Sequence, residues 1–404
     1  MPGSGPTVSG PIVIVGASLA GLRAAQTLRE QGHDGPITLI GAEPHLPYDR
    51  PPLSKEFLAG AMSRSDIDLP LGAADGADFR LATRATGLDL GQRRVVLESG
   101  ETVDFDGLII ATGAQPRTLP GLPTLPGVFL LRTIDDCVAL RHQLEHEPRV
   151  VVVGAGFIGS EVAAHCHDLG LSVTVIEALP VPMVRGVGEL VGRRCARLHT
   201  DHGVELRLGV GVTGLAGTQR VEGVSLADGS VVPAEVVVIG VGVSPTTDWL
   251  EGSGLDVDNG VRCDRWCRAL AGGQPVPGVV AAGDVANWEN PRFGEIMRVE
   301  HWTNAAEQAR QAAFTLLQGE DAPVFDPIPY FWSDQYETKI QFVGRTGPDV
   351  AVVDGSLDDD RFAVAYGSEG RLVGALSFNR PARLMALRKM IDQGDPFPTA
   401  ASAG

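Results

Sequence analysis

The residues with the clearest chemistry lie in a glycine-rich turn that is followed by an acidic residue. Gly154, Gly156 and Gly159 complete the pattern GxGxxG, and Glu177 stands about 20 residues further on, at the end of the next apolar run. In such a turn the first glycine permits the tight bend, the second lets the backbone approach a pyrophosphate, and the third lets helix and strand pack closely. The N–H groups at the start of the helix hold the anion, and the carboxylate takes ribose hydroxyls. The turn therefore predicts a dinucleotide site.

An earlier turn follows the same plan with one departure. Ser18 stands where the middle glycine would lie between Gly16 and Gly21. The acidic residue, Glu43, lies two places past the expected end of the strand, so either Glu43 or the backbone around Ala42 meets the ribose. Two such turns in one chain, each with an acidic residue, predict two nucleotide sites.

Both turns require a βαβ unit to position them. One unit starts at Ile12 and the other at Val150, and each reads as apolar strand, glycine-rich turn, amphipathic helix and apolar strand. The runs 108–113 and 236–242 add a further strand that ends in glycine to each half, so the duplication is extended. A strand from Val279 delivers Asp284 at its carboxyl end, where ligands lie in open α/β sheets, and Asp284 is well placed for a ribityl hydroxyl.

Two stretches indicate crossings between domains. The proline-rich run AQPRTLPGLPTLPG, from Ala114, interrupts any regular element, and a second crossing is expected near Ser244-Pro245. A length of 404 residues predicts two or three domains.

Composition excludes several classes of protein. The 33 basic and 50 acidic residues give a formal net charge of −17, which disfavours nucleic acid as a partner. The first ten residues, MPGSGPTVSG, carry no basic segment, and the apolar run that follows soon breaks, so we expect neither a signal peptide nor a membrane span and place the chain in the cytoplasm. Five scattered cysteines without a CxxC pair disfavour a disulfide framework and a zinc ribbon, and we expect buried thiols and no metal.

The chain resembles the NADH-dependent, FAD-containing ferredoxin reductases of bacterial oxygenase systems, within the glutathione-reductase-like superfamily. The resemblance covers nearly the whole chain, and its most specific motif is YDRPPLSK, which ends at Lys55. The other motifs that carry it are GASLAG, ATGAQPR, LRTIDD, VVVGAGFIGSEVAA, AAGDVAN, EHWTNAAEQA and PYFWSDQ.

The resemblance implies an α/β fold with two Rossmann-like, three-layer nucleotide-binding domains and a C-terminal α+β interface domain. In relatives of this kind the first unit binds FAD and the second binds NADH. The implied domains are a discontinuous FAD domain of residues 1–114 and 247–324, an NADH domain of residues 115–246, and a C-terminal domain of residues 325–404.

Chemistry gives its own reason for a flavin. Nicotinamide delivers two electrons as a hydride, whereas an iron–sulfur cluster accepts one electron at a time, so a carrier of one or two electrons must stand between them. The resemblance implies a [2Fe-2S] ferredoxin as that acceptor, which supplies a haem monooxygenase or a ring-hydroxylating dioxygenase.

Lys55 and Glu161 are the catalytic candidates. Lys55 follows a rigid Pro-Pro segment, and a cation beside the isoalloxazine would favour the reduced, negatively charged flavin; the alternative is a solvated lysine. Glu161 is expected on the first turn of the nicotinamide-binding helix, where its alternative role is a charge on the helix dipole. Relatives support a Lys55–Glu161 pair that couples nicotinamide entry to flavin charge.

The resemblance adds further residues at the FAD. It assigns Asp284 to ribityl hydroxyls and Arg132 to the pyrophosphate, with a surface arginine as the alternative for Arg132. It places Trp302 and Trp332 near the flavin ring, and plain core packing is the alternative for both. His301 has no second histidine or carboxylate at ligand spacing and is interpreted as structural.

Glu177 decides the choice of cofactor. A 2′-phosphate would meet like charge there at about 4 Å, which costs about 4 kcal/mol at an effective dielectric constant near 20, so NADH is expected over NADPH. Arg185, the next cation, is eight positions further on and would contact the adenosine half of NADH.

The complete set of expected cofactor contacts follows. For FAD they are Gly16, Ser18, Ala20, Gly21, Ala42, Glu43, Arg50, Lys55, Ala111, Thr112, Gly113, Arg132, Gly283, Asp284, Trp302 and Trp332. For NADH they are Gly154, Gly156, Phe157, Ile158, Gly159, Glu161, Glu177, Arg185 and Gly242.

Competing functions of the superfamily are separated less sharply. A disulfide or coenzyme A disulfide reductase requires a cysteine close to the flavin, and none lies between Glu43 and Lys55. An NADH oxidase, a monodehydroascorbate-type reductase and an apoptosis-factor-like flavoprotein stay as alternatives, of which the last is disfavoured by the acidic balance. Residues 379–390 predict a helix with basic residues largely off its apolar side, which is either a ferredoxin-docking surface or a solvated face.

Overall fold

The computed structural model describes residues 8–123 and 125–398. The chain divides into two compact units. Unit 1 comprises residues 1–49, 67–115 and 244–329, and unit 2 comprises residues 50–66, 116–243 and 330–404. The first seven residues, on which the expected lack of a signal peptide partly rests, lie outside the described residues. Within the described part of the chain, none of the helices has the length and apolar character that crossing a bilayer requires.

Unit 1 is built on a nine-stranded sheet in the order β22-β21-β18-β19-β20-β7-β1-β2-β3. A separate antiparallel sheet holds β4, β5 and β6. The strands of the large sheet are β1 (Ile12–Val15), β2 (Ile37–Ile40), β3 (Asp78–Arg80), β7 (Gly107–Ile110), β18 (Val261–Cys263), β19 (Arg268–Ala271), β20 (Gln274–Ala281), β21 (Ala286–Asn290) and β22 (Glu295–Met297). The small sheet consists of β4 (Ala85–Asp89), β5 (Arg94–Leu97) and β6 (Thr102–Asp104).

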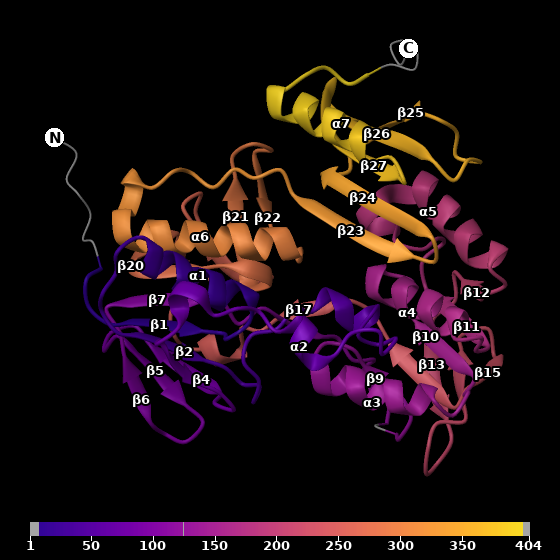
Figure 1. Cartoon of the computed structure of the whole chain (residues 1–404), viewed down its shortest axis with the longest axis horizontal. Coiled ribbons are helices and arrows are strands. Elements are labelled where there is room, and N and C mark those ends of the chain that lie inside the picture. The colour runs from indigo at the N-terminus through magenta and orange to yellow at the C-terminus, as the bar shows by residue number, and fades with distance from the viewer. Residues whose placement is uncertain (1–7, 124, 399–404) are drawn as a thin grey trace. The chain divides into compact units, whose positions relative to one another are not determined.

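The centre of this sheet is parallel and buried. β1 pairs in parallel with both β2 and β7, and β7 pairs in parallel with β20. All four residues of β1 are buried, as expected of a strand covered on both faces. Helices α1 (Leu19–Glu30) and α6 (Trp302–Gln318) pack against each other in the same apolar cluster as alternate residues of β1 and β7 (Figure 1).

Unit 2 repeats the same arrangement. Its five-stranded parallel sheet has the order β12-β11-β10-β16-β9, so β10 lies between β11 and β16 as β1 lies between β2 and β7. The strands are β9 (Val128–Leu130), β10 (Val150–Val153), β11 (Val173–Glu177), β12 (Glu205–Leu208) and β16 (Val236–Ile239), with an antiparallel sheet of β13 (Val212–Ala216), β14 (Gly223–Leu226) and β15 (Val231–Pro233). The helices are α3 (Ile134–Leu144), α4 (Phe157–Asp168) and α5 (Val184–Asp201). The duplication predicted from the two glycine-rich turns is therefore present.

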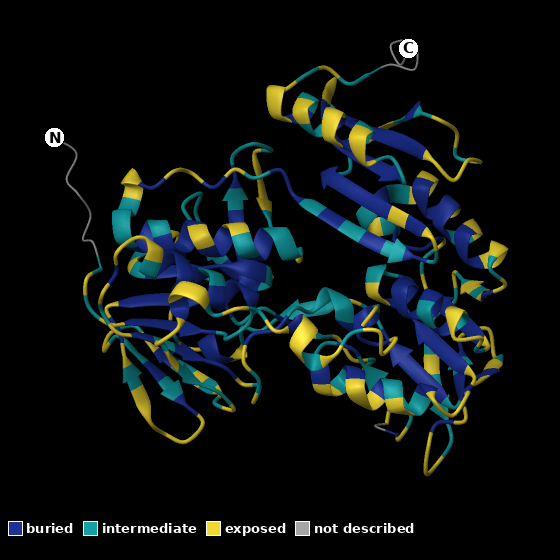
Figure 2. Ribbon diagram, in the orientation of Figure 1, coloured by how far each residue is buried: buried dark blue, intermediate teal, exposed yellow. Residues whose placement is uncertain are grey.

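A five-stranded antiparallel sheet in the order β23-β24-β27-β26-β25 completes unit 2. Its strands are β23 (Tyr330–Gln335), β24 (Thr338–Gly344), β25 (Asp349–Asp354), β26 (Phe362–Ser368) and β27 (Arg371–Phe378), and helix α7 (Pro381–Gln393) follows. The buried aromatic residues of this sheet share an apolar cluster with Val187, Val191 and Leu198 of α5. α7 packs through Leu384, Leu387 and Ile391 and leaves an exposed face outward (Figure 2).

The boundaries of the units differ from the expected domains. The chain passes from unit 1 to unit 2 after Gln115 and returns after Val243, close to both predicted crossings. Residues 50–66 and 330–404 belong to the unit that contains residues 116–243, so the division into three domains stays a prediction. One expectation is wrong: residues 114–116 form β8 (Ala114–Pro116), although the proline-rich run predicted no regular element there. β17 (Val243–Pro245) lies at the second crossing, and the short helix α2 (Arg64–Ile67) ends where residue 67 rejoins unit 1.

Candidate functional site

The first glycine-rich turn is shaped by two close backbone approaches. Gly16 has φ +118°, and a Cβ there would lie 2.0 Å from the carbonyl oxygen of Ala111. A Cβ on Gly21 would lie 1.9 Å from the carbonyl oxygen of Gly16, so only glycine lets α1 approach the end of β1. Ser18 caps α1 with φ −116°, an extended conformation open to any residue, which explains why serine is accepted where the pattern expects glycine.

Further predicted residues of unit 1 meet at the carboxyl ends of β1, β7 and β20. Gly283, with φ +79°, follows β20, and a Cβ there would lie 3.2 Å from the Cβ of Ala20. The N–H of Gly283 donates to Oε1 of Gln308 over 2.9 Å, and the hydroxyl of Thr112 donates to the carbonyl of Thr246 over 2.7 Å. The parallel strands thus bring residues from 16–21, 111–113 and 283–284 to one edge of the sheet.

Two hydrogen-bonded pairs of side chains extend this edge. Glu43 follows β2 and accepts a 2.5 Å hydrogen bond from the hydroxyl of Tyr48. Trp302, the first residue of α6, donates its indole N–H to Oδ1 of Asp49 over 2.6 Å, and burial raises the pKa of that carboxyl. Sequence reasoning singled out neither Tyr48 nor Asp49, although both stand in the motif YDRPPLSK.

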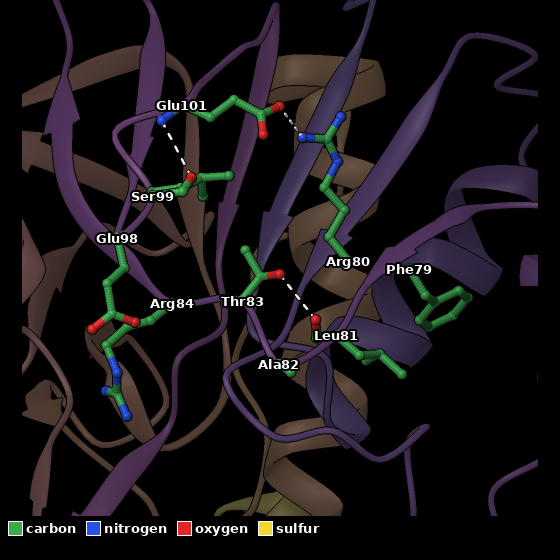
Figure 3. A pocket seen from close by; sticks show the side chains of 10 residues that line it. Phe79, Arg80, Leu81, Ala82, Thr83, Arg84, Glu98, Ser99 and Glu101 are labelled. Atoms are coloured by element: carbon green, nitrogen blue, oxygen red, sulfur yellow. Dashed lines mark hydrogen bonds and ion pairs between the residues drawn. The ribbon is translucent and has the colours of Figure 1, made fainter.

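A pocket of about 750 Å³ adjoins the loop after β2 (Figure 3). Its lining runs from Phe79 to Arg84 and includes Leu97, Glu98, Ser99 and Glu101. The N–H groups of Ala82 and Thr83 donate to the carbonyls of Glu43 and Gly41, so this wall lies beside the predicted ribose contact at residues 42–43. The sequence carried no motif that points to residues 79–84.

The second glycine-rich turn repeats the first. Gly154 has φ +100°, and a Cβ there would lie 2.4 Å from the carbonyl oxygen of Gly240; a Cβ on Gly159 would lie 2.0 Å from the carbonyl oxygen of Gly154. Gly156 is different: its φ is −75°, and the nearest atom to an added Cβ is 3.9 Å away. The fold therefore does not require glycine at position 156, which fits a requirement set by an approaching ligand.

Glu177 is the last residue of β11 and holds the second turn. Its Oε2 accepts the N–H of Ala155 over 2.8 Å, and its Oε1 accepts the N–H of Leu179 over 2.8 Å. The carboxylate is thereby fixed at the end of the strand. Arg185 is exposed near the start of α5, and Ile158 is a partly exposed apolar residue of α4.

Lys55 and Glu161 form an ion pair within unit 2. Pro51 and Pro52 open a short 3₁₀ helix (Pro51–Ser54), because their fixed φ suits its first turn, and Lys55 follows it. The distance from Nζ of Lys55 to Oε1 of Glu161 is 3.2 Å, and their side chains are only 11% and 7% exposed. A freely solvated Lys55 is thereby excluded.

Glu161 does not lie in the first turn of α4, so its expected place is wrong. α4 begins at Phe157, and Glu161, its fifth residue, lies on the buried side of the helix beyond the first turn. A charge on the dipole at the helix end acts within the first turn, so the buried ion pair replaces that alternative.

Several residues that sequence reasoning missed complete this cluster. Ser54 donates its hydroxyl to Oε2 of Glu161 over 2.6 Å, and Ser333 donates its hydroxyl to Oε1 over 2.8 Å. Asp334 accepts a hydrogen bond from Nζ of Lys55 at Oδ2 over 3.0 Å. All three stand in the motifs YDRPPLSK and PYFWSDQ, of which only Arg50, Lys55 and Trp332 were predicted to be site residues.

The cluster has a clear electrostatic balance. Burial raises the pKa of Glu161, and this effect is opposed by Lys55 and the two serine hydroxyls. Burial by itself would lower the pKa of Lys55, but the carboxylates of Glu161 and Asp334 raise it overall. The two carboxylates thus favour the charged form of the lysine.

Trp332 and the predicted arginines also lie in unit 2. Nζ of Lys55 is 5.7 Å from the ring centroid of Trp332, which in turn stacks with Tyr330 at 6.0 Å. Arg50 donates to the backbone carbonyl of Arg132 over 2.6 Å, next to the start of α3. Their contact with FAD stays a prediction.

The cysteines and His301 behave as buried groups. All five cysteines are buried and free, and burial raises the pKa of the Cys137 thiol to about 12. Cys137 lies close to the segment before Lys55, since its Sγ is 3.1 Å from the carbonyl of Leu53, yet a thiol with this pKa is a poor nucleophile at neutral pH. Burial lowers the pKa of His301 to about 4, which makes it neutral near pH 7.

The basic residues of α7 are partly engaged with their own sheet. Arg383 donates to the carbonyl of Val353 over 3.2 Å, and Arg380 lies 3.6 Å from Asp354. Arg388 is half-buried and Lys389 is exposed. A docking role for this helix stays a prediction.

Comparisons with known proteins agree with the two glycine-rich turns. Residues 10–309 match the pyridine nucleotide-disulphide oxidoreductase family, and residues 330–404 match the reductase C-terminal family. The chain is 39% identical to rhodocoxin reductase of Rhodococcus erythropolis over 97% of this chain and 92% of that protein. It is 38% identical to the ferredoxin–NAD(+) reductase component of the anthranilate 1,2-dioxygenase system of Burkholderia cepacia, over 95% of this chain and 94% of that protein.

A solved structure gives the same result. The reductase in the covalent complex of putidaredoxin reductase with putidaredoxin is similar to this chain with a TM-score of 0.90 and 32% identity, over 96% of this chain and 94% of that one. The chain contains two βαβ units with the same strand order, and it is similar to these relatives along almost its full length. It therefore belongs to the pyridine nucleotide-disulphide oxidoreductase family and is an oxidoreductase.

Proposed function

We propose that the chain is an NADH-dependent ferredoxin reductase with FAD as its resident cofactor, which passes single electrons to a [2Fe-2S] ferredoxin of an oxygenase system. The similarity to ferredoxin reductases over more than nine-tenths of the chain is the observation that carries this proposal. When bound, FAD would supply the conversion between hydride transfer from NADH and single-electron transfer to a one-electron carrier.

The residues of unit 1 fit FAD. The turn from Gly16 to Gly21 leaves a backbone cradle that a side chain would fill, and the N–H groups at the start of α1 suit a pyrophosphate. We assign Glu43 or the backbone at Ala42 to the adenosine ribose and Asp284 to the ribityl hydroxyls. The remaining FAD contacts, including Arg132 and Trp302, are proposals inherited from the resemblance.

The residues of unit 2 fit NADH. Gly154 and Gly159 shape the second cradle, and the open space at Gly156 permits close approach of a phosphate. Two backbone N–H groups fix the Glu177 carboxylate, where it accepts from a ribose diol and repels a 2′-phosphate. These contacts support NADH over NADPH.

Lys55 supplies positive charge for the reduction step. In this proposal its ammonium stabilises negative charge on the reduced cofactor, and Glu161 holds the ammonium in place. Ser54 and Ser333 hold the carboxylate of Glu161 through hydrogen bonds from their hydroxyl groups. We also propose that the protein is located in the cytoplasm, because NADH is a cytoplasmic reductant.

A panel of acceptors tests the function. The FAD-loaded protein is supplied with NADH and, in turn, with a [2Fe-2S] ferredoxin, dioxygen, ascorbyl radical and a disulfide. We expect turnover with ferredoxin to exceed the others by at least about tenfold in kcat/KM, a difference of about 1.4 kcal/mol in barrier. Faster turnover with dioxygen, ascorbyl radical or a disulfide would assign the chain to one of the alternative activities instead.

A further inference from the structure

The ammonium of Lys55 contacts a second carboxylate besides Glu161. Its Nζ lies 3.2 Å from Oε1 of Glu161 and 3.0 Å from Oδ2 of Asp334. Asp334 belongs to none of the residue sets that the glycine-rich turns or the resemblance assign. The question is what a second carboxylate does beside the buried ammonium of Lys55.

Glu161 does not depend on Asp334 for its own position. Hydroxyl groups of Ser54 and Ser333 hold both of its oxygens, and its side chain is only 7% exposed. Lys55 is different, because a lysine side chain has four flexible methylenes and an ammonium that rotates freely. One carboxylate would leave the direction of its other N–H bonds open.

Strand β23 supplies both halves of the arrangement. It is the edge strand of its sheet, and successive residues of a strand face opposite sides. Ser333 is buried and contacts Glu161, whereas Asp334, with its side chain 36% exposed, contacts Lys55 from the other face. The same short strand therefore fixes the glutamate and orients the lysine.

Two acceptors determine the geometry of the ammonium. When two of the three N–H bonds are directed at Glu161 and Asp334, tetrahedral geometry fixes the direction of the third. The other oxygen of Asp334 lies 3.3 Å from Nζ of Lys339, whose side chain is 51% exposed. Lys339 thus forms only an exposed ion pair with Asp334.

We propose that Asp334 is a positioning residue that orients the Lys55 ammonium and thereby sets the rate at which NADH reduces the bound FAD. This inference rests on the proposed function. Asp334 acts through Lys55.

Positioning and simple charge make opposite predictions. Loss of the negative charge of Asp334 would, through the electric field alone, raise the reduction potential of the flavin and speed its reduction. Loss of orientation would slow reduction even while the potential rises, because small displacements of a catalytic group are costly in rate. The sign of the rate change therefore separates the two.

The test is the FAD-loaded D334A variant, which removes both the charge and the acceptor, beside the wild-type protein and K339Q. Anaerobic stopped-flow absorbance gives the rate of FAD reduction by NADH, a redox titration gives the flavin potential, and competitive acetylation read by mass spectrometry gives the pKa of Lys55. We expect D334A to keep its FAD, to be reduced about tenfold more slowly at saturating NADH, and to show a lower pKa of Lys55. K339Q should change the rate less than about twofold, because it removes only an exposed ion pair.

The outcomes are distinct. A D334A protein reduced as fast as wild type, or faster, overturns the inference while the proposed function stands. A wild-type protein that NADH does not reduce overturns the proposed function itself. If D334A loses FAD or fails to fold, D334L, which fills the position without an acceptor, carries the test: slower reduction supports positioning, and a rate equal to or above that of the wild type contradicts it.

Discussion

The two glycine-rich turns, each a cradle for a nucleotide, have the same backbone arrangement but are surrounded by different elements. In both, a buried parallel strand ends in a glycine with positive φ, and a second glycine lets the helix approach the strand. Around the first cradle, unit 1 adds β20 with Asp284 and the start of α6, where Trp302 bonds Asp49. Around the second, Glu177 bonds its own turn at Ala155. More elements converge on the first cradle, which suits a resident cofactor, whereas the second suits a coenzyme that exchanges.

The largest effect is expected from alanine at the first glycine of each cradle. Gly16→Ala forces a Cβ to 2.0 Å from the carbonyl of Ala111 at φ +118°, so we expect loss of bound FAD and of its yellow colour. Gly154→Ala, with the same kind of conflict, should keep FAD but lose reduction by NADH. Flavin absorbance after purification and anaerobic reduction by NADH measure both.

Gly156→Ala is the matched control. The fold has room for this Cβ, so the melting temperature should stay near that of the wild type while binding of NADH weakens. Retention of FAD by Gly16→Ala together with its loss in Gly154→Ala would reverse the assignment of the two cradles.

The next largest effect is expected from removal of the Lys55 charge. Lys55→Met should slow reduction of FAD by NADH about 100-fold without loss of FAD, because a preorganised charge is removed from the reacting centre. Glu161→Gln should have a smaller effect of the same sign, since the amide oxygen still accepts from Ser54 or Ser333. Stopped-flow rates at saturating NADH provide the measurement, and unchanged rates in both variants would reject a role for the pair.

A change at Glu177 should alter the preference for NADH over NADPH and leave the FAD content unchanged. Glu177→Gln removes the charge that repels a 2′-phosphate but keeps an acceptor for Ala155 or Leu179. We expect the ratio of kcat/KM for NADH to that for NADPH to fall about tenfold, less than the full Coulomb term because water screens it. FAD content serves as the internal control. A wild-type enzyme that is faster with NADPH would contradict the assignment of Glu177.

The smallest effect at neutral pH concerns a buried histidine in each unit. Burial lowers the pKa of His301 in unit 1 and of His199 in unit 2 to about 4. Between about pH 6.5 and pH 4 the unfolded chain binds more protons than the folded chain. The free energy of unfolding therefore falls as the pH falls through that window, by at most about 3 kcal/mol for each histidine.

Thermal unfolding between pH 7.5 and 4.5 measures this loss. His199→Gln should flatten the dependence on pH, whereas His142→Gln, at an exposed position, should leave it unchanged. Equal slopes in the wild type and both variants would show that His199 does not contribute.

Sequence alone predicted the two βαβ units better than the side-chain contacts at the candidate site. Glycine spacing and apolar runs determine βαβ units locally, and both units are present in the same strand order. The departure at Ser18 is harmless because that residue is extended, which only backbone angles reveal. Glu161 was expected in the first turn of α4 but directly follows it, since the pattern does not mark where α4 begins. Ser333 and Asp334 join Lys55 from about 280 residues away in the chain, a long-range contact that no local pattern encodes.

The most direct test of the central claim follows the stoichiometry of electrons through the two cradles. The FAD-loaded protein is mixed anaerobically with one equivalent of NADH, and oxidised [2Fe-2S] ferredoxin is then added stepwise. We expect the flavin absorbance to bleach with NADH and to return after two equivalents of ferredoxin, because one hydride carries two electrons and each cluster takes one. A flavin that stays oxidised with NADH, or one that bleaches but is not reoxidised by ferredoxin, would contradict the account.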